Sequence, residues 1–263
     1  MVTVGVVPAT WERLSDLDGE RSSWWFAAWD TEAVGCWIQV TAHRPSGRTW
    51  YVATWVEAGG SPVIVADDEM PWPRPERYLE IRGRGLWAHH VCEEPLQRWS
   101  VGLEAVAVAH DDPAQGLDDG WGDPDGLAGD LEWEGIGPVT TRGAGYDQPC
   151  RVDGVYERVG RELRLDDASG HRGRFTGDDE PSLVLVGRLE GRPVAAVGEA
   201  RWSPVELPRH ASADVDGATV SAAPTAHVAW RWPDGATYAV ASVELTSADG
   251  RTGSGLVRWR GVA

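Results

Sequence analysis

The sequence predicts an all-β protein. Apolar and polar residues alternate with a period of two over most of the chain, which is typical of strands. Asp-Gly and Glu-Gly pairs in the second half lie where tight turns between strands are needed. Only residues 8–20 could hold a short helix. A hydrophobic share of 42% supports a real core, so 263 residues suffice for one large β-domain or two smaller ones.

The first half contains a series of expected strands. They are joined by turn signals such as Arg-Pro-Ser-Gly, and the turn at residues 93–97 predicts a hairpin. Residues 70–76 form a Pro-rich loop that excludes a central strand. The expected strands of this half are residues 22–30, 33–44, 47–59, 61–69, 77–94 and 98–112.

Residues 113–138 are dense in Gly, Asp and Pro, and we interpret them as a long, lid-like loop between two halves. The expected domains are therefore residues 1–135 and 136–263. The second half holds seven further strand-like runs in meander order. Such halves favour barrels or strongly curved sheets, because closure removes exposed strand edges.

Charge and cysteine content narrow the possible partners and location. Acidic residues outnumber basic ones by 41 to 24, and a net charge of −17 disfavours nucleic acid as a partner. The three cysteines are far apart in the sequence, which is typical of reduced thiols in a cytoplasmic protein. The first residues lack the pattern of a signal peptide. No apolar run reaches the ~18 residues of a transmembrane helix, so we expect no stable membrane insertion.

Tryptophan is unusually frequent, with 16 residues against 2 Phe and 5 Tyr. Most indoles of a β-protein fill its core, but so many favour a site for an apolar small molecule, because indole faces bind rings and polyenes. The candidate wall residues are Trp24, Trp25, Trp87 and Trp230. Trp24 and Trp25 are adjacent in a strand, so at most one of them faces a given cavity.

A hairpin over residues 145–177 carries the polar candidates. Tyr146 and Gln148 share one face of their strand, and His171 and Arg172 follow on the paired strand. Tyr146 or His171 could protonate an alkene or carbonyl, whereas Gln148 and Arg172 could hold a carbonyl oxygen. The alternative is structural: Tyr146 packs in the core and Arg172 pairs with Asp166 or Asp167.

Glu199 is a further candidate acid if its strand face points inward. On an outward face it would form only a surface ion pair with Arg201, worth under ~1 kcal/mol.

Other chemistries are weakly signalled. His89 and His90 are neighbours in a strand and point to opposite faces, so they cannot bind one metal ion from the same side. The acidic run at residues 118–126 lacks the closing Glu of a calcium loop. A nucleophile elbow, a phosphate loop and a dinucleotide fingerprint are also missing. We therefore expect neither a metal nor a cofactor.

Four stretches together suggest a family: residues 93–99, 145–167, 170–177 and 251–261. The layout resembles the carotenoid 1,2-hydratase (hydroxyneurosporene synthase) and AttH-like family, which includes decalin-forming Diels–Alderases. This resemblance spans most of the chain and implies two tandem lipocalin-like β-domains, built as barrels or curved sheets.

The resemblance breaks at the family motif Gly-x-Arg-Asp-His-Ser-Trp-Gly. Gly170, Arg172 and Gly177 match it, but Gly173 stands at the Asp position and Arg174 at the His position. If that Asp is the proton donor of the hydratases, this chain lacks it.

The first functional hypothesis is a cofactor-independent cyclase of secondary metabolism. It would fold a polyene, polyketide or isoprenoid precursor against Trp faces and select the reactive conformer. The alternatives are a hydratase or isomerase acting on an isoprenoid double bond, with Glu199 or His171 as the acid, and a non-catalytic carrier of an apolar metabolite. A structural or protein-binding β-module is the weakest reading.

Overall fold

The computed structural model describes Glu12 and residues 20–30, 34–72, 78–118, 121–142, 145–177, 180–198, 207–215 and 217–261. Within these ranges the chain is almost entirely β, with short 3-10 turns such as η2 (Arg44–Ser46) and η3 (Gln115–Leu117). The possible short helix at residues 8–20 lies outside the described residues, apart from Glu12 and Glu20.

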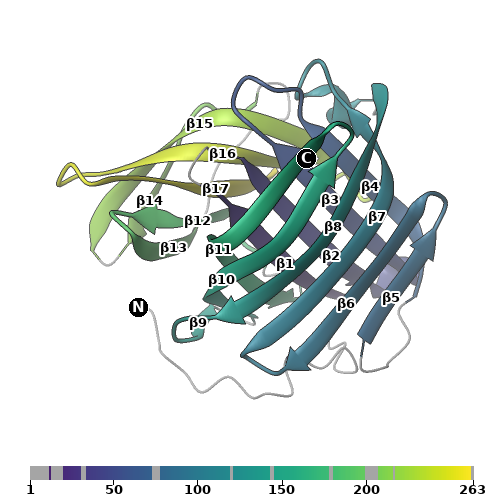
Figure 1. Ribbon diagram of the computed structural model, residues 1–263, viewed down its shortest axis with the longest axis horizontal. Coiled ribbons are helices and arrows are strands. Elements are labelled where there is room, and N and C mark those ends of the chain that lie inside the picture. The colour runs from purple at the N-terminus through teal and green to yellow at the C-terminus, as the bar shows by residue number, and fades with distance from the viewer. Residues whose placement is uncertain are drawn as a thin grey trace.

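The first sheet is a nearly closed barrel (Figure 1). Its described strands follow the order β4-β3-β2-β1-β11-β10-β8-β7-β6-β5, and β9 pairs with β10. A short pairing of β4, at one end of this order, with β7 joins Val63↔Ala109 and Ile64↔Val108 and nearly closes the sheet on itself. The strands are β1 (Arg21–Trp29), β2 (Gly35–His43), β3 (Arg48–Val56), β4 (Val63–Pro71), β5 (Tyr78–Gly83), β6 (Leu86–Glu94), β7 (Arg98–Ala109), β8 (Asp123–Gly135), β9 (Thr140–Arg142), β10 (Gly145–Arg158) and β11 (Arg161–Thr176).

The second sheet lies beside the barrel, on the left in Figure 1. Its order among the described residues is β13-β12-β17-β16-β15-β14. The Glu190-Gly191 turn between β12 and β13 has positive φ at both residues, as predicted. The strands are β12 (Leu183–Leu189), β13 (Arg192–Gly198), β14 (Ala211–Val215), β15 (Ala218–Arg231), β16 (Thr237–Ser247) and β17 (Thr252–Gly261).

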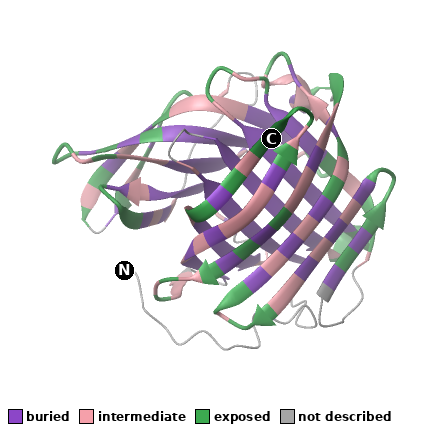
Figure 2. Ribbon diagram, in the orientation of Figure 1, coloured by how far each residue is buried: buried purple, intermediate pink, exposed green. Residues whose placement is uncertain are grey.

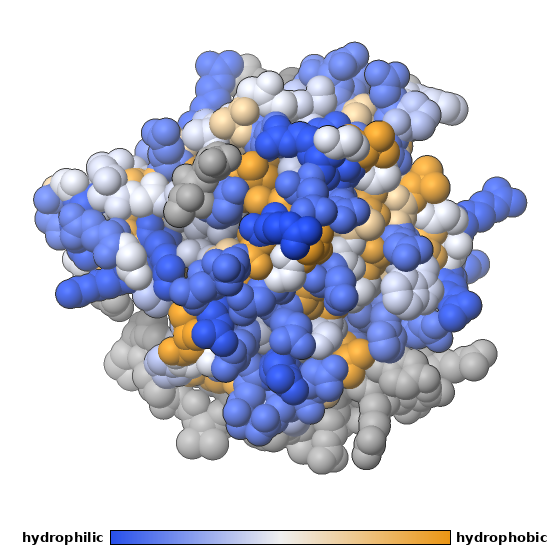
Figure 3. Space-filling model, viewed as in Figure 1, coloured by the Kyte–Doolittle hydropathy of each residue, from blue (hydrophilic) through white to orange (hydrophobic). Residues whose placement is uncertain are grey.

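Strand β1 shows how side-chain alternation builds the core. Trp24 and Phe26 point into the barrel, whereas Trp25 and Trp29 belong to a second cluster shared with residues of the second sheet. All nine residues of β1 are buried, because the second sheet covers the outer face of this strand. On the side of the barrel away from the second sheet, strands alternate between buried and exposed residues (Figure 2). The face toward the viewer in Figure 3 carries hydrophilic residues with hydrophobic ones interspersed among them.

The fold class is confirmed: the protein is all-β, with curved sheets of the lipocalin-like type. The prediction of a lid-like loop over residues 113–138 is wrong, because much of this segment is strand β8, which pairs with both β7 and β10. Leu127, Leu131 and Trp133 are buried and belong to the barrel core. Acidic residues between them face outward, so a dense run of Asp, Glu and Gly concealed an ordinary strand. The single strand expected over residues 77–94 is also wrong, because Tyr78–Gly83 and Leu86–Glu94 form two strands, β5 and β6, with a turn at Gly85, where φ is +70°.

The two sheets do not divide the chain at residue 135. Strands β10 and β11 belong to the barrel, and the change of sheet falls between Thr176 and Leu183. The hairpin that was expected to open the second half therefore lies in the middle of the first sheet, between β1 and β8. Whether each sheet folds as an independent domain stays a prediction.

The described part of the chain contains no helix of the length and apolarity that a membrane span requires. The cytoplasmic location stays a prediction.

Candidate functional site

Four buried polar side chains meet inside the barrel, and we name Glu12, Tyr146, Gln148 and Arg172 the barrel cluster. Tyr146 and Gln148 lie on β10, two residues apart, and Gln148 is in register with Arg172 on β11. This places the three side chains on the same face of the sheet, which is the interior one. Glu12 comes from the segment before β1 and is 1% exposed.

The Glu12 carboxylate is the centre of the cluster. One oxygen, Oε1, accepts the hydroxyl of Tyr146 and pairs with Nη1 of Arg172. The other, Oε2, accepts the backbone N–H of Leu96 and the indole N–H of Trp99, the latter at 3.2 Å. A buried carboxylate is tolerated only when it is paired and hydrogen-bonded in this way.

Gln148 positions the arginine of the cluster. Its Oε1 accepts from Nη2 of Arg172 at 2.7 Å, while its Nε2 donates to the carbonyls of Leu96 and Gly137 at 3.0 and 3.2 Å. Gly135 leaves room for this amide, because a Cβ there would lie 2.4 Å from Nε2 of Gln148. The guanidinium of Arg172 is thus fixed from both sides.

The environment controls the protonation of these groups. Burial, and then the neighbouring carboxylate of Glu12, raise the pKa of Tyr146 well above its ordinary value. Burial lowers the pKa of Arg172, but Tyr146 and Glu12 outweigh it, so the net shift is upward. The phenol therefore stays protonated and the guanidinium stays charged at physiological pH. A phenol, a carboxylate and a cation in contact can pass a proton and stabilise developing negative charge.

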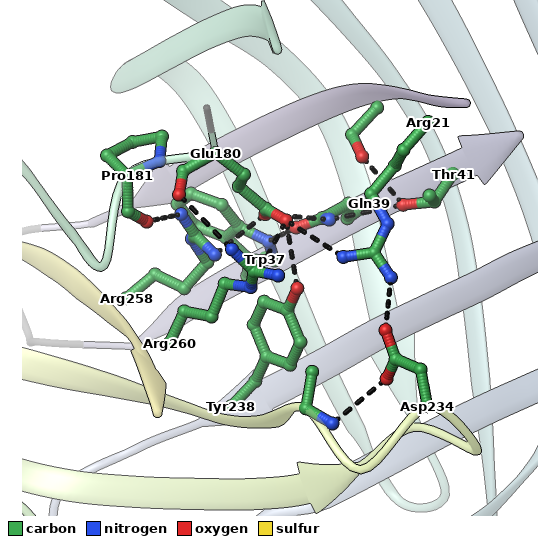
Figure 4. Close-up of polar contacts among 12 residues, drawn as sticks. Arg21, Trp37, Gln39, Thr41, Glu180, Pro181, Asp234, Tyr238, Arg258 and Arg260 are labelled. Carbon is green, nitrogen blue, oxygen red and sulfur yellow. Dashed lines mark hydrogen bonds and ion pairs between the residues drawn. The ribbon is translucent and has the colours of Figure 1, made fainter. Parts of the chain in front are cut away.

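A second buried cluster of the same residue types lies between the two sheets (Figure 4), and we name Glu180, Tyr238 and Arg258 the interface cluster. Oε1 of Glu180 accepts from Nη1 of Arg258 at 2.8 Å, and Oε2 accepts the hydroxyl of Tyr238 at 2.8 Å. Gln39 and Arg21, both from the barrel, also approach the carboxylate, at 3.4 and 3.7 Å. Groups from both sheets therefore converge on one acid.

Arg258 is fully buried and surrounded by aromatic rings. Its guanidinium lies 5.8 Å from the ring centroid of Trp37, 5.7 Å from Phe175 and 5.4 Å from Tyr238. Contacts of this kind are worth about 2 kcal/mol or more when desolvated. Because they span β2, β11 and β16, the interface cluster fastens the barrel to the second sheet.

The structure brings together part of the predicted site. Tyr146, Gln148 and Arg172 share the barrel cluster. Trp24 points to the same interior, where Arg174 lies 5.0 Å from its ring.

His171 lies on the opposite face of β11 from Arg172. Its ring stacks on Trp25, with centroids 6.3 Å apart, and its Nε2 is 3.4 Å from Oδ1 of Asp147. His171 and Tyr146 therefore do not share a site, because consecutive residues of a strand point to opposite faces.

The remaining candidates are dispersed. Trp230 stacks on Tyr238 between the sheets, with ring centroids 5.3 Å apart. Trp87 is half-buried on the outer side of the barrel, where its indole N–H donates to Glu80 at 3.3 Å. Glu199 lies outside the described residues.

The predicted structural partners of Arg172 are wrong, because Asp166 and Asp167 are exposed and the guanidinium pairs with Glu12. Sequence reasoning missed both Glu12 and Glu180. Neither stands out locally among 41 acidic residues, and both reach their partners only through tertiary contacts.

Gly173, at the position of the family Asp, has no room for a side chain. A Cβ there would lie 2.4 Å from the carbonyl oxygen of Tyr146 and 2.8 Å from the Trp25 ring. The departure from the family motif is thus built into the packing of Trp25.

Many of the tryptophans fill packed clusters. Trp24, Trp55, Trp99 and Trp133 belong to the barrel core. The cluster between the sheets holds six more, including Trp25, Trp37 and Trp230. Trp230 and Trp232 also border a cleft of about 370 Å³ between the sheets. A Trp-lined chamber for a substrate stays a proposal. Among the described residues, no three His, Cys, Asp or Glu side chains are grouped as metal ligands.

Comparisons with known proteins support the fold. A family model described as a domain of unknown function (DUF7064) matches residues 15–174, a range that ends two residues before the last barrel strand does. No curated protein matches the chain. The crystal structure of kievitone hydratase from Nectria haematococca is similar, with a TM-score of 0.52 and 10% identity over 93% of this chain and 91% of that chain. At this identity the likeness concerns the fold alone.

Proposed function

The chain belongs to the family described as a domain of unknown function (DUF7064), and we propose from its barrel cluster that it is a hydratase- or lyase-type enzyme acting on a hydrophobic small molecule without a cofactor. The observation that carries this proposal is the buried contact of the Glu12 carboxylate with both the Tyr146 phenol and the Arg172 guanidinium. The fold shared with kievitone hydratase supports it by analogy.

The cluster suits the addition of water to a double bond. Glu12 accepts a proton from water as the water oxygen bonds to one carbon, and Tyr146 donates its proton to the negative charge that develops on the substrate. Water gives one proton to Glu12 and its remaining hydroxyl to the substrate, and the phenol gives its proton to the substrate. Glu12 then returns its proton to Tyr146 through their hydrogen bond, which resets the pair. The reverse sequence eliminates water.

The raised pKa of Tyr146 restricts the substrate. A weakly acidic phenol does not protonate an isolated alkene, but it can protonate an enolate oxygen or carbon. We therefore favour a double bond conjugated to a carbonyl group. Arg172, held by Gln148, stabilises the negative charge of the intermediate.

A cyclase and a double-bond isomerase stay alternative proposals for the same interior. In the cyclase, the barrel cluster would anchor one polar group of a linear precursor, and the Trp24 face would hold its chain. Arg174, lying over Trp24, supports such an anchor beside an indole wall. A carrier of an apolar metabolite would use the interior without chemistry.

An isotope experiment separates these reactions. The protein is incubated with carbonyl-conjugated alkenes and, separately, with kievitone, in water enriched in heavy oxygen and deuterium, and the products are read by mass spectrometry. Hydration adds one heavy oxygen and solvent hydrogen, and isomerisation introduces deuterium alone. Cyclisation gives a new isomer without solvent atoms, and a carrier returns the substrate unchanged.

The matched variants are Glu12→Gln and Glu180→Gln, which remove equivalent buried charges from the two clusters. We expect the wild type and Glu180→Gln to form product that contains heavy oxygen, and Glu12→Gln to form none. Product formed equally by wild type and Glu12→Gln would contradict the assignment of the site.

A further inference from the structure

Within the part of the chain that the structure describes, His90 and Tyr51 are polar side chains of the barrel interior without hydrogen-bond partners. His90 on β6 is 1% exposed and Tyr51 on β3 is fully buried. Among the described residues, neither ring nitrogen of His90 nor the hydroxyl of Tyr51 has a partner, and the indole N–H of Trp24 is also unpartnered. A buried polar group without a partner lowers the stability of the folded protein, so the presence of these groups calls for a physical reason.

The unpartnered groups are neighbours. The rings of His90 and Tyr51 meet edge to face with centroids 5.8 Å apart, and Phe26 lies 5.4 Å from His90. Trp24 and Tyr51 are both in register with Val40 of β2, so Trp24, Val40 and Tyr51 lie side by side at one level of the barrel wall. The rings of His90 and Tyr51 are therefore in contact, and Trp24, Phe26 and Tyr51 belong to the apolar core of the barrel.

This group adjoins the barrel cluster. Cys92 follows His90 by two residues on the same face of β6, and its Sγ lies 3.9 Å from Oε2 of Glu12. Phe26 also contacts Trp99, whose indole N–H donates to Glu12. A molecule that reaches His90 would thus lie next to the proposed acid–base pair.

His90 offers both kinds of hydrogen bond. Burial lowers its pKa to about 3, so its ring is neutral at physiological pH and presents one N–H donor and one acceptor nitrogen. Tyr51 adds a hydroxyl donor. A hydroxyl or carbonyl oxygen is the complement of this set, whereas a charged group would meet no counter-ion among the ring neighbours of His90.

We propose that His90 and Tyr51 bind the oxygen-bearing end of an apolar substrate inside the barrel. This inference rests on the proposed function in one respect: the bound molecule is the substrate that the barrel cluster acts on. The pair are binding and positioning residues, and the unmet hydrogen bonds are completed when the substrate enters.

The first test measures the stability of the unliganded protein. Tyr51→Phe and His90→Leu remove groups without partners, so we expect melting temperatures equal to or above that of the wild type. Tyr156→Phe is the matched control, because Tyr156 is also buried in the barrel but its hydroxyl donates to the Thr54 carbonyl at 3.0 Å. That variant should melt at a lower temperature. If Tyr51→Phe is destabilised as much as Tyr156→Phe, an ordered water occupies the place and the proposal fails.

The second test measures binding of phenol and toluene, which differ only by a hydroxyl in place of a methyl group. Affinities are obtained by NMR titration with labelled histidine ring nitrogens. In the wild type we expect phenol to shift the ring-nitrogen resonances of His90. In Tyr51→Phe and His90→Leu the affinity for phenol should fall by about tenfold, whereas the affinity for toluene should change by less than about twofold. Tyr156→Phe should bind both like the wild type. Absence of phenol binding to the wild type, or equal losses for both probes, would overturn the proposal.

The two proposals fail in different ways. If Glu12→Gln binds phenol normally and still converts substrate, the proposed function is wrong and the binding site stands. If it loses turnover while His90→Leu changes neither phenol binding nor KM, the site of chemistry stands and the role of His90 is wrong.

Discussion

The Tyr146 phenol donates its hydrogen bond to the carboxylate of Glu12, a residue 134 positions earlier in the chain. The guanidinium of Arg172 meets the same carboxylate oxygen. The contact joins the segment before β1 to the β10–β11 hairpin inside the barrel. Glu180 and Tyr238 repeat this chemistry between the two sheets, so the molecule supplies its own structural control for the proposed site.

The ion pair of Glu12 and Arg172 should be strongly coupled in stability. Removing one partner of a buried pair costs about 3–5 kcal/mol, because the other charge is left uncompensated. We expect Arg172→Gln and Glu12→Gln each to lower the free energy of unfolding by an amount in this range. The double variant should lose clearly less than the sum of the two single losses. Urea unfolding of the four proteins measures the coupling. Additive losses would show that the two side chains do not interact.

His90 should make stability depend on pH. Its pKa is lowered from an unfolded value of about 6.5 to about 3, so folding favours the neutral ring. That contribution is complete above pH ~6.5 and is lost as the pH falls toward ~3, by about 1.4 kcal/mol per pH unit.

The comparison of wild type with His90→Leu isolates this contribution. His89, Tyr51 and Cys92 lie near His90 and are unchanged in both proteins, and acidic groups contribute equally. The wild type should lose more stability on acidification than the variant does. Parallel curves of unfolding free energy against pH would mean that His90 titrates normally.

Cys92 should report on the charge of Glu12. Burial, and then the Glu12 carboxylate, raise the pKa of the Cys92 thiol to about 12. In the native protein its alkylation should therefore be slow. Glu12→Gln removes the nearby negative charge, so Cys92 should react faster, because the thiolate is the reactive form.

Cys36 is the internal control for that experiment. It is fully buried, and its pKa is raised to about 12 by burial, independently of Glu12. Mass mapping of alkylated thiols in mild conditions separates the two sites. Equal acceleration at Cys36 and Cys92 would indicate general loosening of the fold and not a change in local charge.

Much of the fold followed from strand periodicity. The β10–β11 hairpin was predicted, with Tyr146 and Gln148 on one face, because alternation fixes which side chains lie together on a strand. Alternation did not reveal β8, since its Asp, Glu and Gly content is also typical of loops. The sheet to which a hairpin belongs is likewise set by pairing with distant strands, as β11 pairs with β1.

The site was only half predictable for the same reason. Arg172 and His171 were both candidates, and their opposite orientations follow from alternation alone, but which face is the interior depends on the position of the second sheet. Glu12 could not be found from its local sequence, because its partners lie on β7, β10 and β11.

The comparison of Tyr146→Phe with Tyr238→Phe tests the central claim most directly. Both changes remove one buried hydroxyl from a Glu–Arg cluster, and Tyr238→Phe should cost stability by about 1.5–3 kcal/mol while keeping turnover near the wild-type rate. Tyr146→Phe should lower kcat/KM by about 100-fold or more, because the proton donor is lost. If Tyr146→Phe turns over substrate as fast as Tyr238→Phe does, the barrel cluster is not the site of the chemistry.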